Sequence, residues 1–243
     1  MKKFLATLAM FFALIFALHA ETWQVYTTGN GLNDNNVNCF AAMKSFIAVG
    51  TNLGANVYNG ENASWHSLKL PDEVASSPIK DIAFDNNGHL WLASARGLVH
   101  MQGKQIYLYG VNDGLPTVDV DKIQIREGKI YAGCFGGYIC SAVVPLNGRS
   151  AFTPVNYRYE DVETSFKMRS VGISGLGILN PAKGWYSTQG EGLIEQIGPN
   201  AYPINGIDGM PESWVNDFWV YQGPSRNTHI ISITPEHISL IRN

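Results

Sequence analysis

Short apolar segments alternate with polar, glycine-rich turns after residue 20, and the alternation repeats with a period of roughly 40 to 54 residues. Four of the five repeats begin with a Gly-Leu-Pro-like loop, and a complete repeat continues with three short apolar runs and ends with an aromatic run. Small residues close the second run, and in four repeats a glycine follows, at Gly54, Gly97, Gly137 and Gly192. Such a glycine is typical of a tight hairpin turn. The pattern therefore predicts four short β-strands in a complete repeat.

The first three repeats predict strands at about 36–43, 45–51, 54–59 and 64–69; 78–85, 89–95, 97–101 and 105–110; and 119–126, 129–134, 137–144 and 151–155. The fourth repeat is the least regular and predicts strands at about 166–174, 184–189, 192–197 and 200–204. The last repeat offers three strands, at about 214–221, 228–234 and 236–242. Residues 22–28 form a further strand-like segment that belongs to no repeat.

One four-stranded unit per repeat is the pattern of a β-propeller blade. The segment 22–28 supplies the strand that the last repeat lacks, and pairing the two would protect the sheet edges of an open array. We therefore predict an all-β protein with a single five-bladed β-propeller of four-stranded blades over residues 21–243. Its ring would be closed by the N-terminal strand pairing into the last blade. An open or two-domain β-protein is the alternative.

The second repeat carries the most complete motif, with Leu70-Pro71, then Asp85 and Gly88, then the run Leu90–Ser94, and finally Gly97-Leu98. This pattern resembles the two-component regulator propeller repeat. In that family the repeat usually forms the periplasmic sensor part of large hybrid histidine kinases. Because this sequence has fewer repeats and no kinase part, the resemblance implies a free-standing exported propeller.

The first twenty residues read as a targeting signal. Lys2 and Lys3 precede an apolar run, Phe4–Leu18, and the small residue Ala20 follows. This is typical of a secretory signal peptide, expected here over residues 1–20, and the run is shorter than the roughly 20 residues of a membrane span. An uncleaved N-terminal anchor is the alternative. We expect the protein to be exported to the periplasm or secreted.

The charge composition excludes several partners. Charged residues make up 15% of the chain, the net charge is -3, and lysine and arginine do not cluster. This argues against a nucleic-acid partner, and against a membrane partner once the signal is cleaved. We expect a monomer.

Cysteine usage predicts no metal site and leaves a disulfide open. Of the three cysteines, Cys134 and Cys140 flank the turn-like FGGY segment and Cys39 stands apart. A Cys134–Cys140 disulfide is one interpretation for an exported protein, and buried free thiols are the favoured one. No His or Cys pairs stand at zinc-ligand spacing, so we expect no metal and no cofactor.

Candidate chemistry lies in the loops that lead into the innermost strands, because in a propeller these loops surround one mouth of the central channel. Acids and amides beside an aromatic surface suit a sugar or another polar ligand. The candidate ligand-binding residues are Asp34, Asn35, Asn36, Asp119, Asp121, Ser213, Trp214 and Asn216.

Two functions of different class fit these loops. The first is a non-catalytic module that binds a small molecule, a glycan or a protein, in a sensor-like or scaffold-like role. The alternative is a glycoside hydrolase with paired carboxylates at the channel mouth. Asp34, Asp121, Glu163 and Asp217 are the acids that could converge. No nucleophilic triad or phosphate loop is indicated, so we expect binding without catalysis.

Overall fold

The computed structural model describes residues 23–145, 148–155, 172–180, 182–197, 200–204, 208–223 and 227–242. The expected signal peptide at 1–20 and the loop acid Glu163 lie outside these residues. Among the described residues, no helix is long and apolar enough to cross a membrane.

The chain folds into five antiparallel sheets, here called blades 1 to 5 in chain order. Blade 1 consists of β1 (Val37–Met43), β2 (Phe46–Thr51), β3 (Gly54–Asn59) and β4 (Ser64–Ser67). Blade 2 consists of β5 (Ile79–Phe84), β6 (Leu90–Ser94), β7 (Gly97–Gln102) and β8 (Gln105–Tyr109). Blade 3 consists of β9 (Val120–Arg126), β10 (Lys129–Cys134), β11 (Tyr138–Val143) and β12 (Thr153–Pro154).

Blade 4 consists of β13 (Ile173–Asn180), β14 (Lys183–Thr188), β15 (Leu193–Ile197) and β16 (Asn200–Ile204). Blade 5 has three described strands, β17 (Asp217–Gln222), β18 (Thr228–Ile233) and β19 (Ile238–Arg242). The short helix α2 (Asp72–Ala75) links blades 1 and 2, and a single 3-10 turn, Val111–Asp113, links blades 2 and 3. The predicted blade count and nearly all strand positions are thereby confirmed.

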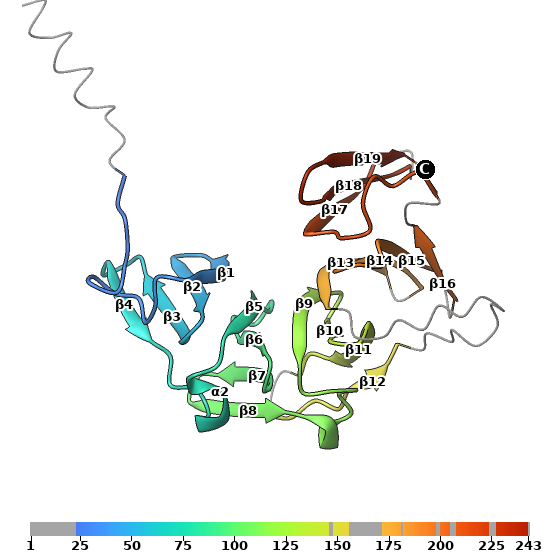
Figure 1. Cartoon of the computed structure of the whole chain (residues 1–243). Coiled ribbons are helices and arrows are strands. Elements are labelled where there is room, and N and C mark those ends of the chain that lie inside the picture. The colour runs from blue at the N-terminus through green and yellow to red at the C-terminus, as the bar shows by residue number, and fades with distance from the viewer. Residues whose placement is uncertain are drawn as a thin grey trace, which may run out of the picture.

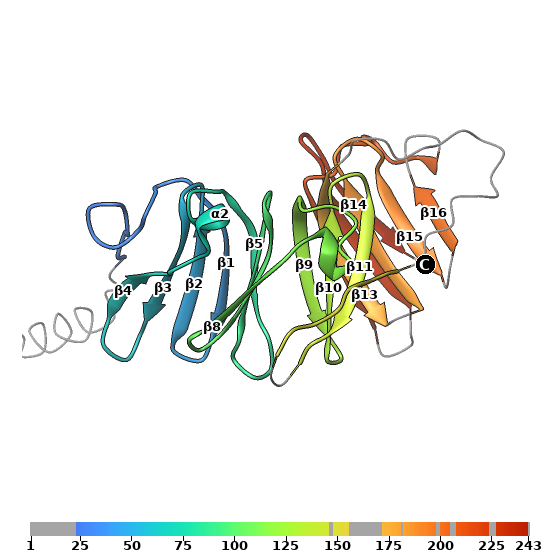
Figure 2. The same ribbon diagram turned by 90° about the horizontal axis from the view of Figure 1, so that it is seen from below.

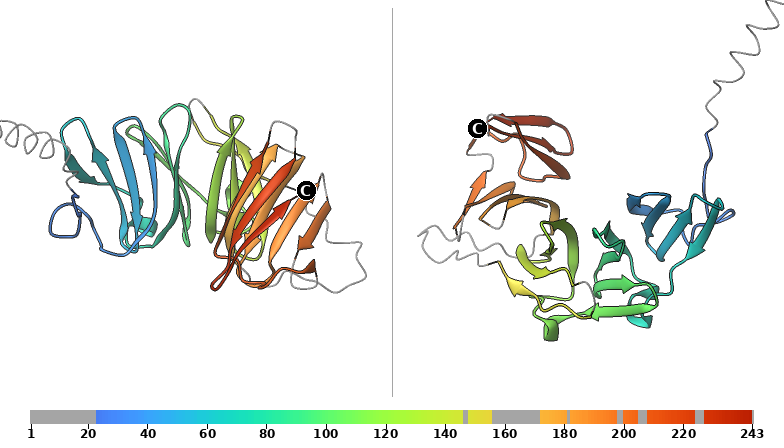
Figure 3. Two further views of the ribbon diagram at one scale, coloured as in Figure 1. Left: turned by 90° about the horizontal axis from the view of Figure 1, so that it is seen from above. Right: turned by 180° about the vertical axis from the view of Figure 1, so that it is seen from behind.

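The blades follow one another around an arc, and the first strand of each blade lies on its inner side (Figure 1). Each of these inner strands contacts the next one, from β1 through β5, β9 and β13 to β17. When the arc is viewed edge-on, the blades stand side by side with their strands running in roughly the same direction (Figure 2, and Figure 3, left). This arrangement brings the loops before the inner strands to one end of the arc's concave side.

Neighbouring blades pack through small residues on one side and branched residues on the other. An ideal Cβ built on Gly133 would lie 2.8 Å from Ile173 Cγ2, and one built on Gly50 would lie 2.7 Å from Ile79 Cγ2. These glycines let a β-branched side chain of the next inner strand approach the backbone. Large side chains fill the rest of the space between blades, and Trp91 and Tyr109 are the largest fully buried members of the cluster between blades 2 and 3.

The predicted closure of the ring is wrong for the described residues. Residues 23–28 form no strand, and the views along the arc show it open between blades 1 and 5 (Figure 1, and Figure 3, right). Tyr26 instead packs against blade 1, with its ring centroid 5.6 Å from that of Tyr58 and 5.2 Å from that of Trp65. Of the segment's two aromatic residues, Tyr26 therefore packs on its own neighbouring blade, while Trp23 is 92% exposed.

The first strand of the fourth blade was also misplaced. It was expected at 166–174, but β13 spans Ile173–Asn180, and residues 166–171 lie outside the described part of the chain. In the structure Gly175 and Gly177 make room for Phe218 of blade 5, whose ring atoms would lie 2.9 Å from a Cβ at either position.

All three cysteines are free thiols. Cys134 and Cys140 are fully buried on adjacent strands of blade 3, and both Sγ atoms lie within 4.0 Å of the Ala132 carbonyl oxygen. The favoured interpretation, buried small residues, describes these two positions.

Candidate functional site

Four of the five inner strands begin with the same irregularity, a β-bulge at the second residue. An apolar residue pairs normally with the second strand, and the next residue bulges out of the ladder. The bulged residues are Asn38 in β1, Lys80 in β5, Asp121 in β9 and Ser174 in β13. Asn216 stands directly before β17 and follows the buried Val215, so it takes the corresponding position in blade 5. A bulge re-aims a side chain away from the regular alternation of a strand.

These five polar residues line one pocket of about 520 Å³ on the concave side of the arc, here called the inner pocket. Every blade therefore contributes at least one polar group to it. The remaining lining residues are Asn52, Pro78, Asp119, Lys122, Phe135, Gly172, Ile173 and Gln189. Amides, hydroxyls and charges of both signs dominate the walls, while the exposed Phe135 supplies an aromatic face at the β10–β11 turn of blade 3.

A charged group of three side chains crosses the inner pocket between blades 2 and 3. Lys80 Nζ donates a hydrogen bond to Asp119 Oδ1 and another, 2.7 Å long, to Asp121 Oδ1. Burial lowers the pKa of Lys80, but the hydrogen bonds to the two carboxylates outweigh it and leave the pKa above its usual value. The ammonium therefore stays charged and holds both carboxylates in place.

Asp121 also ties its blade to the next one. Its Oδ2 accepts the Ile173 N–H of blade 4 at 3.0 Å, just as Asp81 Oδ2 accepts the Ile123 N–H of blade 3 at 2.9 Å. Burial raises the pKa of Asp121, while Lys80 and the Ile173 N–H act in the opposite direction. The Asp121 carboxylate thus serves the packing of the blades as well as the pocket wall.

The structure divides the eight residues predicted for ligand binding. Asp119, Asp121 and Asn216 line the inner pocket. Asp34, Asn35 and Asn36 do not, and they hold the N-terminal loop instead. Asp34 Oδ1 accepts the Asn36 N–H at 3.2 Å, and Asn35 Oδ1 accepts the Thr28 N–H at 2.8 Å.

Ser213 and Trp214 also lie outside the lining. The Ser213 carbonyl accepts the Gly192 N–H at 2.7 Å, and Trp214 forms an isolated β-bridge with Gln189, a residue of the pocket wall. The Trp214 side chain is half-exposed beside the site.

Sequence reasoning overlooked Asn38, Lys80 and Ser174 because they fall inside predicted strands and not in loops. Their signal is positional, since each directly follows the apolar residue that opens an inner strand: Val37, Ile79 and Ile173. Comparing that position across the repeats would have selected the pocket wall.

A second pocket, of about 570 Å³, lies beside α2 and the β6–β7 turn. Its walls include Asp72, Glu73, Ser76 and Arg96, and Pro78 separates it from the inner pocket. It involves only blade 2 and the loop before it, so it lacks the five-fold contribution that marks the inner pocket.

Comparison with known proteins identifies the fold but not the family. No known family profile matches the chain, and no curated protein matches it in sequence. Among solved structures, the β-propeller domain of Cps50 (Swd1) from Myceliophteria thermophila aligns over 88% of this chain and 73% of its own, with 10% identity and a TM-score of 0.54. The chain has a β-propeller fold.

Two further similar structures come from bacterial cell surfaces. The extracellular domain of BT4673 from B. thetaiotaomicron, described as a hybrid two-component system, aligns over 84% of this chain with 14% identity and a TM-score of 0.64. PorZ, a surface component of the type-IX secretion system of Porphyromonas gingivalis, aligns over 90% with 12% identity and a TM-score of 0.65. The propeller spans 27% and 34% of the lengths of these two structures. At such identities the likeness is one of fold.

Proposed function

We propose that this propeller is a non-catalytic binding module whose inner pocket takes a hydroxyl-rich ligand, such as a sugar. The observation that carries the proposal is the convergence of five equivalent polar residues, one from each blade, on a single pocket. Amide and carboxylate groups exchange hydrogen bonds with hydroxyls, and an aromatic ring such as Phe135 packs against the apolar face of a sugar ring. The paired charges of Lys80 with two aspartates favour a neutral ligand over an ionic one.

The proposal includes a setting outside the cytoplasm and a sensor-like or scaffold-like role. It is supported by the resemblance to the two-component regulator propeller repeat and by the similar structures, of which BT4673 is an extracellular domain. It is supported also by the basic and apolar pattern of residues 1–20.

The test is a glycan-array screen of the mature protein followed by calorimetry with any glycan that binds. Asn216→Ala removes one amide from the pocket wall, and no described hydrogen bond uses that side chain. We expect it to weaken binding about three- to tenfold, the cost of one hydrogen bond. The matched control is Asn227→Ala, an exposed asparagine in the same blade next to β18, outside the pocket lining. Equal weakening by both variants, or no glycan bound at all, would refute the sugar proposal.

One observation bears on the alternative of a glycoside hydrolase. Asp119 and Asp121 contact the same ammonium, so two carboxylates lie close together in the pocket. Both come from the same side of the pocket and share the Lys80 charge, whereas a hydrolase places its two carboxyl groups on either side of the scissile bond. The arrangement favours binding. Release of reducing sugar from a bound glycan, abolished by Asp119→Asn, would establish the alternative instead.

A further inference from the structure

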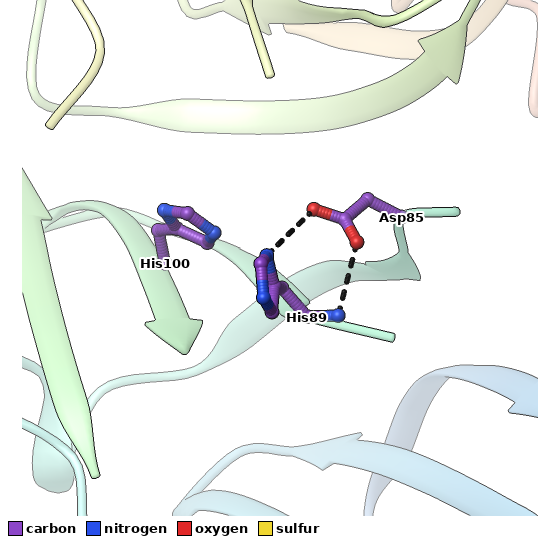
Figure 4. A group of neighbouring side chains, drawn as sticks. All are labelled: Asp85, His89 and His100. Carbon is purple, nitrogen blue, oxygen red and sulfur yellow. Dashed lines mark hydrogen bonds and ion pairs between the residues drawn. The ribbon is translucent and has the colours of Figure 1, made fainter. Parts of the chain in front are cut away.

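A second cluster of polar side chains lies at the other end of blade 2, where the β5–β6 hairpin turns. It consists of Asp85, His89 and His100, and Figure 4 shows the His89 ring standing between the other two side chains. The ligand-type atoms of the three residues lie within 4.8 Å of one another. None of the three lines the inner pocket.

Asp85 is held rigidly in this cluster. Its Oδ1 accepts the backbone N–H groups of Asn87 at 2.8 Å and His89 at 3.0 Å, which fixes the turn. Its Oδ2 faces the Trp91 Nε1 at 3.3 Å and the His89 Nδ1 at 3.2 Å. A buried carboxylate with its orientation set by the backbone is preorganised as a ligand.

His100 is the unusual member. It is fully buried between blades 2 and 3 and lies flat on Trp91, with ring centroids 3.7 Å apart. Neither of its ring nitrogens has a hydrogen-bond partner among the described residues. A neutral imidazole carries one N–H and one lone pair, and leaving both unpaired in the interior is costly. An apolar residue would fill the same space without that cost. The unpaired ring nitrogens of His100 therefore indicate a bound ligand.

The neighbouring His89 supplies the second imidazole. Its ring centroid lies 5.4 Å from that of His100, and it is only partly exposed. Gln102 Nε2 approaches the same Nδ1 atom at 3.5 Å, so both Asp85 and Gln102 contact this nitrogen.

We propose that Asp85, His89 and His100 bind a divalent transition-metal cation of the zinc type, with water as the fourth ligand. Two imidazoles and one carboxylate match the nitrogen and oxygen donors that Zn²⁺ takes when three protein ligands leave one position open. In a tetrahedral site with bonds of about 2.0 to 2.1 Å, neighbouring ligand atoms lie about 3.3 Å apart. The Asp85–His89 pair stands at 3.2 Å, and the ligand atoms of all three residues lie within 4.8 Å of one another.

The cation would tie the β5–β6 hairpin of blade 2 to its third strand, β7, under the cover of blade 3. This assigns it a stabilising role in the middle of the arc, independent of the ligand of the inner pocket. The other group of metal-ligand type among the described residues, Glu212, Glu236 and His237, is mostly exposed. It has no buried unpartnered imidazole and carries no such inference.

The test uses the tag-free, chelator-treated mature protein, titrated with Zn²⁺ by calorimetry and with Co²⁺ by visible absorption. We expect one equivalent to bind, a ligand-field spectrum of low-symmetry Co²⁺, and a higher melting temperature with Zn²⁺ than without it. His100→Phe keeps the packing on Trp91, and His89→Gln changes a partly exposed side chain. Each should weaken Zn²⁺ binding by at least about tenfold and remove the thermal shift.

The matched control is His66→Gln, which removes an exposed imidazole of blade 1 and should leave zinc binding unchanged. Circular dichroism of the metal-free variants distinguishes lost ligands from lost fold, and His89→Gln remains informative should His100→Phe unfold. The proposal is overturned if the wild type binds no Zn²⁺, if Co²⁺ gives only the spectrum of the hydrated ion, or if the control loses as much affinity as the two ligand variants. None of these zinc-binding results tests glycan binding in the inner pocket, so either proposal can fail while the other stands.

Discussion

Blades 2 and 5 are built from the same repeat, yet their strands are buried differently. Every residue of β6 in blade 2 is buried, whereas buried and more exposed residues alternate along β18, its counterpart in blade 5. Trp91 of β6 is 0% exposed, and Trp219 of β17 is 58% exposed. Blade 2 has a neighbour on both faces, whereas among the described residues blade 5 has one only on the side of blade 4 (Figure 1).

The difference shows that the neighbouring blade, and not the strand's own sequence, decides burial in this fold. Apolar residues occupy both faces of blade 5, and those turned away from blade 4 remain exposed, among them Trp219, Tyr221 and Ile231. Phe40 of β1 is exposed in the same way at the other end of the arc. The stabilising contacts should therefore lie between neighbouring blades, and the outer faces of blades 1 and 5 should contribute little.

The largest contrast is expected between the two tryptophans. Trp91→Ala should lower the free energy of unfolding by about 3 to 5 kcal/mol, because it opens a large cavity between blades 2 and 3. Trp219→Ala removes an exposed ring and should cost less than about 1 kcal/mol. Urea denaturation followed by circular dichroism measures both. Similar losses would mean that the outer face of blade 5 is covered in solution.

A smaller contrast is expected between two glycines. Gly133→Ala places a Cβ against the β-branched Ile173, at 2.8 Å from its Cγ2, and should cost about 1 to 3 kcal/mol by forcing blades 3 and 4 apart. Gly223→Ala, in blade 5, meets nothing closer than 3.6 Å and should change the free energy of unfolding by less than about 0.5 kcal/mol. Thermal unfolding of the two variants checks the pair, and a harmless Gly133→Ala would argue against tight blade packing.

The sequence predicts the blades well and the assembly of the blades poorly, for a physical reason. Strands within a blade are joined by tight turns, so glycines and alternating residues mark them locally. Which face of a blade meets a neighbour depends on contacts far apart in sequence, and so does the packing of Tyr26 on blade 1. The same limit applies to the site. Asp119, Asp121 and Asn216 were found from their loops, but Asn38, Lys80 and Ser174 stand inside predicted strands, and their common position shows only when the repeats are compared with one another.

The pH dependence of stability at two aspartates tests the comparison of buried and exposed blades. Asp81 and Asp217 take the same place in their inner strands, and each accepts the next residue's N–H through Oδ1, at 3.0 and 2.8 Å. Asp81 is covered by blade 3, and burial raises its pKa, while Lys122 and two backbone N–H groups act in the opposite direction. A carboxyl whose pKa is higher in the folded state stabilises the fold at low pH, and this contribution is lost as the pH rises through the folded pKa.

Asp81→Asn keeps the acceptor for the Ile123 N–H and removes the buried charge. It should therefore raise the free energy of unfolding by on the order of 1 kcal/mol near neutral pH, and the gain should fade as the pH falls below about 4. Asp217→Asn at the exposed position should change it by less than about 0.5 kcal/mol. Denaturation curves at a series of pH values decide the matter, and a destabilised Asp81→Asn at neutral pH would mean that the charge itself holds blade 3.

The smallest expected effect concerns the reactivity of the thiols. Labelling them compares an end blade with a central blade without altering the stability of the protein. Cys39 in blade 1 is partly exposed, and burial raises its pKa to about 12, with Asp81 adding to the shift and Lys122 and the Gly50 backbone opposing it. Cys134 and Cys140 in blade 3 are fully buried, and their mutual hydrogen bond and burial raise the pKa of Cys134 further.

Because the thiolate is the reactive form, iodoacetamide should label Cys39 slowly and the blade 3 pair only after unfolding. Mass spectrometry counts the labels. Three labels in denaturant without a reductant would confirm free thiols, whereas a single label would reveal a disulfide between the two cysteines of blade 3.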